Sequence, residues 1–169
     1  MIRIGKIVAT HGLNGALILS HIVGESDWLK KEDVLFVEVR KGSHIPFFVS
    51  AAKAANEEEY IVNVEDTDTV EAARQLIGKQ VYVKEDILKG HAEDSPLLWI
   101  GFNLVDKTQG SLGPIEDVMQ AGAQWLAKVT VEGKEALIPL VADMILDVNI
   151  RNKYVRMDLP EGLLEVYLG

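Results

Sequence analysis

The first half of the chain alternates between short apolar runs and clusters of turn-forming or charged residues. The runs are rich in β-branched and aromatic residues, and several alternate apolar with polar positions, which is the pattern of half-buried strands. They predict six strands, at Ile2–Ala9, Ala16–Ile22, Val34–Arg40, Ile45–Ala51, Tyr60–Val64 and Gln80–Val83. Six short strands at this spacing are typical of a small β-barrel.

One segment of this half, Asp68–Ile77, has helical periodicity. Its apolar residues recur on a single helical face, at Val70, Ala73, Leu76 and Ile77. Asp66–Asp68 offers N-cap oxygens, Glu71 follows at capping-box spacing, and Gly78 can end the helix. The two aspartates could also serve a metal or an acid–base pair, but helix capping accounts for both of them.

Residues 84–97, with the sequence KEDILKGHAEDSPL, are charged and lose their periodicity after Leu88. Gly90 and Pro96 interrupt this stretch further, so it reads as an interdomain linker. We therefore expect an N-terminal β-barrel domain at residues 1–88, a linker at 89–97 and a second domain at 98–169.

Strand patterns resume in the second half of the chain. Apolar or alternating runs occur at Leu98–Val105, Pro114–Met119, Trp125–Val131, Ala136–Leu140, Met144–Val148 and Lys153–Asp158. Asp106–Gly113 is a turn-rich hairpin connection, and Glu132–Lys134 forms a hairpin turn whose glycine tolerates positive φ. Pro139 suits a strand end or a sheet edge. The expected fold is mainly β, with two small β-barrel domains and one short helix near residues 68–77.

The composition narrows the possible chemistry. The chain has 169 residues, 48% of them hydrophobic, and no cysteine, which excludes disulfides, thiolate nucleophiles and cysteine-based zinc sites. No secretion signal is recognisable, and no apolar stretch reaches the length of a membrane span. We expect a soluble cytoplasmic protein.

The net charge of −9 argues against a stand-alone nucleic-acid binder, because such a protein depends on neutralising phosphates. The charge is uneven. Residues 1–56 hold seven Lys or Arg against five Asp or Glu, a net of +2, whereas residues 57–169 hold ten against 21, a net of −11. The acidic part suits a basic protein partner, or it simply keeps the protein soluble, and the composition leaves both open.

Enzyme signatures are missing from the sequence. There is no Walker A loop, and no G-x-G-x-x-G opens a helix. The nearest approach to a nucleophile elbow, Gln109–Gly113, has glutamine where the first glycine belongs. The histidines His11, His21, His44 and His91 lack the spacing of metal ligands. We expect no catalytic residue, no metal and no cofactor.

The stretch GKIVATHGLNGAL, residues 5–17, places a histidine beside a glycine-bracketed turn. Gly12, Asn14 and Gly15 all tolerate positive φ, so a turn between two strands explains them. It does not explain His11, which is either an ordinary surface residue or part of a site.

Residues 5–15 resemble the N-terminal signature G-x-I-x-x-x-H-G-x-x-G of the RimM family of bacterial ribosome maturation factors. Further matches follow in the expected order, at Glu71–Gly78, Leu112–Gly113, Ala121–Ala123, Ile138–Pro139 and Leu159–Leu164. The resemblance implies a six-stranded barrel like those of translation factors, followed by a PRC-type β-barrel.

The resemblance also implies a function. It would be a non-enzymatic assembly factor, a monomer that assists maturation of the small-subunit head by binding a basic ribosomal protein and the 16S rRNA of the immature particle. Two places depart from the family pattern. Its Tyr-Tyr pair at the start of the second domain is replaced by Asp94-Ser95-Pro96, and its Gly-Ala-Asn-Asp stretch reads Gly122-Ala123-Gln124-Trp125.

The resemblance suggests two sets of site residues. The rRNA or particle would be contacted by Lys6, Thr10, His11, Gly12, Asn14 and Gly15. A protein partner would be anchored by Trp99, Phe102 and Trp125, which could instead be barrel core. Two rival functions stay open: an enzyme with His11 as general base on the N-terminal barrel, and a PRC-barrel adaptor unrelated to ribosomes.

Overall fold

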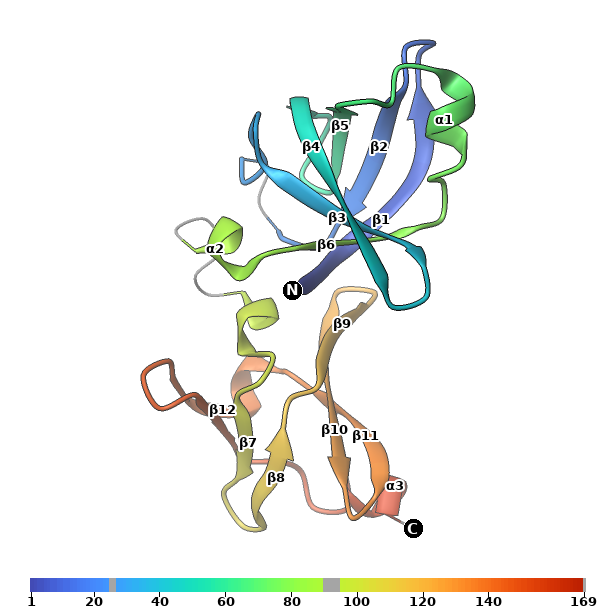
Figure 1. The fold of residues 1–169 in the computed structure, drawn as a ribbon. Coiled ribbons are helices and arrows are strands. Elements are labelled where there is room, and N and C mark those ends of the chain that lie inside the picture. Colours follow the sequence, from blue (N-terminus) through green and yellow to red (C-terminus); the bar gives the residue numbers. More distant parts are fainter. Residues whose placement is uncertain (25–26, 90–94, 169) are drawn as a thin grey trace. The chain divides into compact units, whose positions relative to one another are not determined.

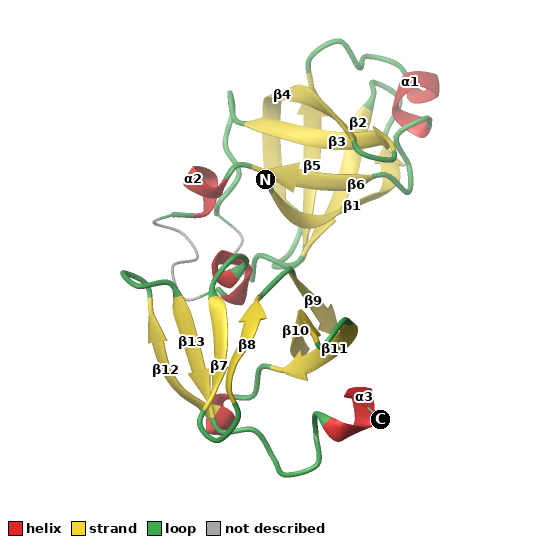
Figure 2. Cartoon of the chain, turned by 60° about the horizontal axis from the view of Figure 1, so that its bottom comes forward, coloured by secondary structure: helices red, strands yellow, loops and turns green. Residues whose placement is uncertain are grey.

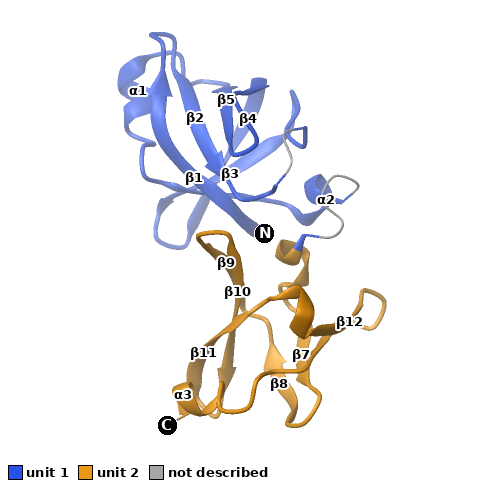
Figure 3. Cartoon of the chain, turned by 180° about the vertical axis from the view of Figure 1, so that it is seen from behind, with its two compact units in different colours: residues 1–95 blue, residues 96–169 orange. Residues whose placement is uncertain are grey.

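The computed structural model describes residues 1–24, 27–89 and 95–168, and the chain divides into two compact units, Met1–Ser95 and Pro96–Gly169 (Figure 3). Most of the predicted linker, including His91 and Asp94, lies outside the described residues. The exact domain boundaries therefore stay a prediction. Within the described residues, no helix is long and apolar enough to cross a membrane.

The first unit is a closed barrel of six antiparallel strands in the order β1-β2-β5-β4-β3-β6 (Figures 1 and 2). The strands are β1 Ile2–His11, β2 Ala16–His21, β3 Val34–Arg40, β4 Ser43–Ala54, β5 Glu59–Val64 and β6 Gln80–Val83. The predicted six-stranded barrel is confirmed, with each strand close to its expected position.

Side chains at alternate positions along the strands point inward and fill the barrel. Leu35 and Val37 of β3 and Val81 and Val83 of β6 point inward and are almost fully buried, while the residues between them are half-buried. Each such side chain stabilises the fold by about 1.5–3 kcal/mol through removal from water. Gly5 allows β1 and β2 to approach, because a Cβ there would collide with the carbonyl oxygen of Ser20.

Two short helices accompany the barrel. Helix α1 is Val70–Arg74, shorter than predicted, and its N-cap is Thr69, whose Oγ1 accepts a hydrogen bond from the Ala72 N–H at 3.2 Å. The predicted cap at Asp68 is thus wrong by one residue, because Thr69 is the last extended residue before the helix. Helix α2, Glu85–Leu88, was not predicted, and its Leu88 is fully buried.

The second unit contains two sheets, one with strand order β11-β10-β9 and the other β12-β13-β7-β8. Their strands are β7 Asn103–Asp106, β8 Gly110–Pro114, β9 Asp117–Ala121, β10 Gln124–Val131, β11 Lys134–Pro139, β12 Ile145–Asn149 and β13 Tyr154–Met157. The Glu116 N–H donates to the Lys128 carbonyl at 2.8 Å, which joins the segment after β8 to β10.

Short helical turns complete this unit: η1 Pro96–Trp99, η2 Ala142–Met144 and α3 Glu165–Leu168. The predicted strand at Leu98–Val105 is wrong in its first half, where η1 buries Leu97 and Trp99. The chain becomes extended only after Gly101, whose φ of 91° marks a turn. The prediction of a mainly β protein with two β domains is confirmed.

Candidate functional site

The glycine-bracketed motif forms the tip of the β1–β2 hairpin. Thr10 and His11 are not loop residues, as the pattern suggested, but the last residues of β1, where they pair with Leu17 and Ala16. The turn itself is residues 12–15. The strands of the barrel wall therefore fix the backbone of His11.

The glycines of the tip have structural roles. Gly12 has a φ of 68° and open space around it, so only its backbone conformation calls for glycine. Gly15 has a φ of 87°, and a Cβ there would also collide with the carbonyl oxygen of Thr67. Gly15 thus lets the hairpin tip pack directly against the segment that leads into α1.

The side chains at the tip face solvent. His11, Leu13 and Asn14 are exposed, and Leu13 has 84% of its surface accessible. Within the described residues, the side chains of Thr10, His11 and Asn14 make no hydrogen bond or ion pair. A single exposed leucine is common on protein surfaces. The tip is a candidate contact surface because exposed His11, Leu13 and Asn14 lie close together at one hairpin end.

Lys6 does not belong to this tip. It lies within the barrel wall, paired with Ser20 and Gln80, and five residues of strand place it roughly 16 Å from His11. Exposed acids border the tip instead, because Asp66 and Asp68 flank the Thr67 backbone that touches Gly15. Carboxylates repel a bare phosphate. The tip is therefore better suited to base and sugar edges than to phosphate groups.

The geometry of a general base is not assembled around His11. Such a base needs a partner that orients its imidazole, and no described side chain hydrogen-bonds to His11. In the described part of the chain, no group of three His, Cys, Asp or Glu residues could hold a metal ion.

A second histidine, His21, lies inside the barrel unit with 3% of its surface exposed. Its ring is 5.2 Å from the Trp28 ring and 5.5 Å from the Tyr60 ring, and its Nδ1 accepts a hydrogen bond from the Val23 N–H at 3.3 Å. Burial lowers the pKa of His21 to about 4. The residue is thus neutral and structural.

The three aromatic candidates of the second unit differ in exposure. Trp99 and Phe102 are each only 7% exposed and contribute to the core. Trp125 is half-buried at the start of β10, opposite Gln120 and beside the β9–β10 turn. Of the three, Trp125 is the one that remains a candidate anchor for a partner.

The second unit also carries an acidic groove of about 540 Å³ that the sequence patterns did not indicate. It is lined by Asp106, Thr108, Gln109, Asp158, Leu159, Pro160, Glu161, Gly162 and Glu165. The parallel pairing of β7 with β13 places Asp106 beside Met157, so two segments distant in sequence meet there.

The Asp106 carboxylate accepts hydrogen bonds from both of the segments that meet at this groove. One carboxylate oxygen accepts hydrogen bonds from the Thr108 and Gln109 N–H groups at 3.1 and 2.8 Å, and the other accepts one from the Leu159 N–H at 3.0 Å. Burial opposes the charged form of the carboxylate, but these backbone donors outweigh it and lower the pKa of Asp106. The Asp106 charge is therefore a fixed part of the groove.

A closed six-stranded barrel with a glycine-bracketed hairpin tip, followed by a second unit of two sheets, defines a two-domain β protein. Residues 2–88 match the family model of the RimM N-terminal domain, and residues 99–163 match that of the RimM PRC barrel domain. The chain belongs to the RimM family.

Curated relatives align over nearly the whole chain. The ribosome maturation factor RimM of Geotalea uraniireducens (strain Rf4) is 31% identical over 168 residues, covering 98% of this chain and 96% of that protein. The protein of the same name from Christiangramia forsetii is 32% identical, with 98% and 95% covered. A solved RimM structure from Pseudomonas aeruginosa is 20% identical and superposes with a TM-score of 0.46, covering 94% of this chain and 97% of that one.

Proposed function

We propose that this chain is a non-enzymatic ribosome maturation factor of the cytoplasm that assists assembly of the small-subunit head. It would bind a basic ribosomal protein and the 16S rRNA of the immature particle. The name of the curated relatives supports the general role in ribosome maturation. The observation that carries the binding function is the hairpin tip, where His11, Leu13 and Asn14 are exposed and, among the described residues, the side chains of His11 and Asn14 make no hydrogen bond or ion pair.

The tip would contact rRNA through hydrogen bonds and apolar packing. His11 and Asn14 can exchange hydrogen bonds with base and sugar edges, and Leu13 can pack against an unstacked base or a ribose. The barrel wall and the close packing of Gly15 on Thr67 would hold these groups in a fixed position. Lys6 would contribute only if the particle also covers the barrel wall.

The second unit would bind the protein partner. Residues 97–169 hold ten acids and six bases, a net of −4, and four acids line one groove. Most ribosomal proteins are basic, so opposite charges would steer the encounter, and the association rate would fall as salt rises. Trp125 is the proposed apolar anchor, because charge alone gives weak and promiscuous complexes.

The test is co-sedimentation of the purified chain with immature small subunits. Replacing His11 by Ala and Leu13 by Ser should reduce the bound fraction about tenfold, whereas thermal stability should hardly move, because exposed substitutions usually change it by less than about 0.5 kcal/mol. Ile150→Ser, on a residue 59% exposed at the β12–β13 turn and outside the acidic groove, is the matched control. Unchanged binding of the tip variant would contradict the proposed tip contact.

A further inference from the structure

The outer wall of the first barrel carries an aromatic face on three neighbouring strands. Because Leu35, Val37, Val81 and Val83 point inward, the residues between them in β3 and β6 point outward. The strand register then places Phe36 between Tyr82 and Pro46, and Val34 beside Phe48. The face consists of Val34, Phe36, Pro46, Phe48 and Tyr82.

This composition is unusual for the outside of a small barrel. A half-buried strand normally shows polar residues on its solvent side. Phe48 is nevertheless 49% exposed, and Phe36 and Tyr82 are half-buried. The interior is already filled by the inward residues of the same strands. The aromatic face is therefore not required to complete the core.

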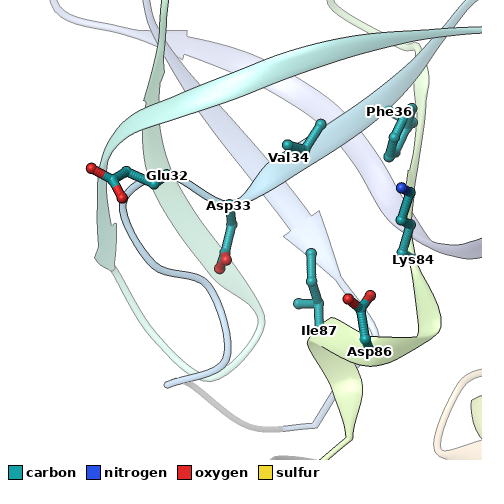
Figure 4. Close-up of a pocket in the computed structure, with 7 residues that line it drawn as sticks. All are labelled: Glu32, Asp33, Val34, Phe36, Lys84, Asp86 and Ile87. Carbon is teal, nitrogen blue, oxygen red and sulfur yellow. The ribbon is translucent and has the colours of Figure 1, made fainter.

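Basic side chains and a histidine ring lie on or beside these aromatic rings. Lys84 Nζ is 6.0 Å from the centroid of the Phe36 ring, and Figure 4 shows the two side chains next to each other. The His44 ring lies edge-on to Tyr82 at 4.4 Å. Arg40 and Lys41, both exposed, stand at the β3–β4 turn at the far end of β3.

Acids are concentrated at the opposite end, where β3 begins. Glu32, Asp33 and Asp86 line a pocket of about 260 Å³ beside Phe36 (Figure 4). On the face itself, Glu38 accepts a hydrogen bond from the Tyr82 hydroxyl at 3.2 Å and lies 3.3 Å from His44 Nε2. A negatively charged backbone would therefore be directed toward Arg40 and Lys41, away from the acidic end.

We propose that this aromatic face binds single-stranded RNA by stacking bases on Phe36, Phe48 and Tyr82, with the phosphates toward the β3–β4 turn. The inference rests on the proposed rRNA-binding function and adds a second contact surface to it. A chain with a net charge of −9 cannot depend on phosphate neutralisation alone. Stacking does not require net positive charge and tolerates any base sequence.

The test measures fluorescence anisotropy of a labelled, unstructured RNA of about 12 nucleotides with the full chain, at about 50 mM salt. Phe48→Ala should weaken binding about tenfold or more, as loss of one stacked base does. Phe48→Trp should retain the affinity. Ile45→Ala is the matched control, because Ile45 is 42% exposed on the same strand but pairs with the inward-facing Val37.

The salt dependence provides a second readout. With phosphate contacts only from Arg40 and Lys41, the logarithm of affinity should fall with the logarithm of salt at a slope of about −1.4. Replacing Arg40 and Lys41 by Gln should make this slope shallower by about 1.4, and Phe48→Ala should leave it unchanged. A steep slope that Phe48→Ala reduces would overturn the stacking assignment.

Sedimentation with immature small subunits separates the two proposals. If the wild-type chain binds the particle but not the RNA oligonucleotide, stacking on this face is wrong while the assembly function stands. If Phe48→Ala loses the particle but keeps its RNA affinity, the face contacts a protein, and the inference is also wrong. If the wild-type chain binds neither, the proposed function itself fails.

Discussion

Single residues explain why the motif at the hairpin tip has its spacing. Gly5 and Gly15 are needed because a Cβ would strike the carbonyl oxygens of Ser20 and Thr67. His11 and Leu13 are not required by close packing in this way, since both side chains are exposed. His21 is the opposite case, a histidine held neutral inside the fold. The two histidines look alike in the sequence and differ completely in burial.

His21 makes the stability of the barrel depend on pH. Its folded-state pKa of about 4 lies below the ordinary value of 6.5, so protonation favours the unfolded chain. The unfolding free energy should be constant above about pH 7. It should fall by on the order of 3 kcal/mol as the pH drops from about 6.5 to about 4. Urea unfolding followed by tryptophan fluorescence at several pH values measures it.

The control for this prediction is His21→Phe, which fills the same aromatic surroundings and cannot titrate. Its stability should vary much less between pH 7 and about 4.5. The lowered pKa of Asp106 acts in a separate range, because that stabilisation is lost only as pH falls below its ordinary value of 3.8. A wild-type chain equally stable at pH 7 and about 4.5 would contradict the role assigned to His21.

The sequence predicts strands correctly where apolar and polar residues alternate along a short segment. Burial alternates clearly in β3, β5 and β6, and these strands lie where the pattern placed them. The pattern failed in residues 98–102, where an apolar run forms a helical turn because its side chains reach the core without an extended backbone. It also missed α2, whose four residues leave too little periodicity to detect.

The N-cap of α1 gives a test at the scale of one element. Thr69→Ala removes the Oγ1 acceptor of the Ala72 N–H and should cost about 1 kcal/mol of unfolding free energy. Asp68→Ala is the matched control and should change stability by less than about 0.5 kcal/mol. Chemical denaturation measures the unfolding free energy of both variants. A larger loss for Asp68→Ala would restore the capping box expected from the sequence.

At the scale of the whole molecule, the division into two β units follows from composition and patterning, but the binding surfaces do not. The acidic groove depends on the parallel pairing of β7 with β13, which no local pattern encodes. The aromatic face depends on the register among β6, β3 and β4. Closeness in sequence predicts that Lys6 and His11 act together, but β1 places Lys6 in the barrel wall, away from the hairpin tip.

The proposed function of this chain is to assist maturation of the small ribosomal subunit through surfaces that bind the immature particle. The most direct measurement is sedimentation of a cell extract through a density gradient, with the chain detected in each fraction. We predict that a fraction of the protein molecules travels with free small subunits, and that none travels with complete ribosomes. If the protein stays entirely at the top of the gradient, as an enzyme or an unrelated adaptor would, the proposed function is wrong.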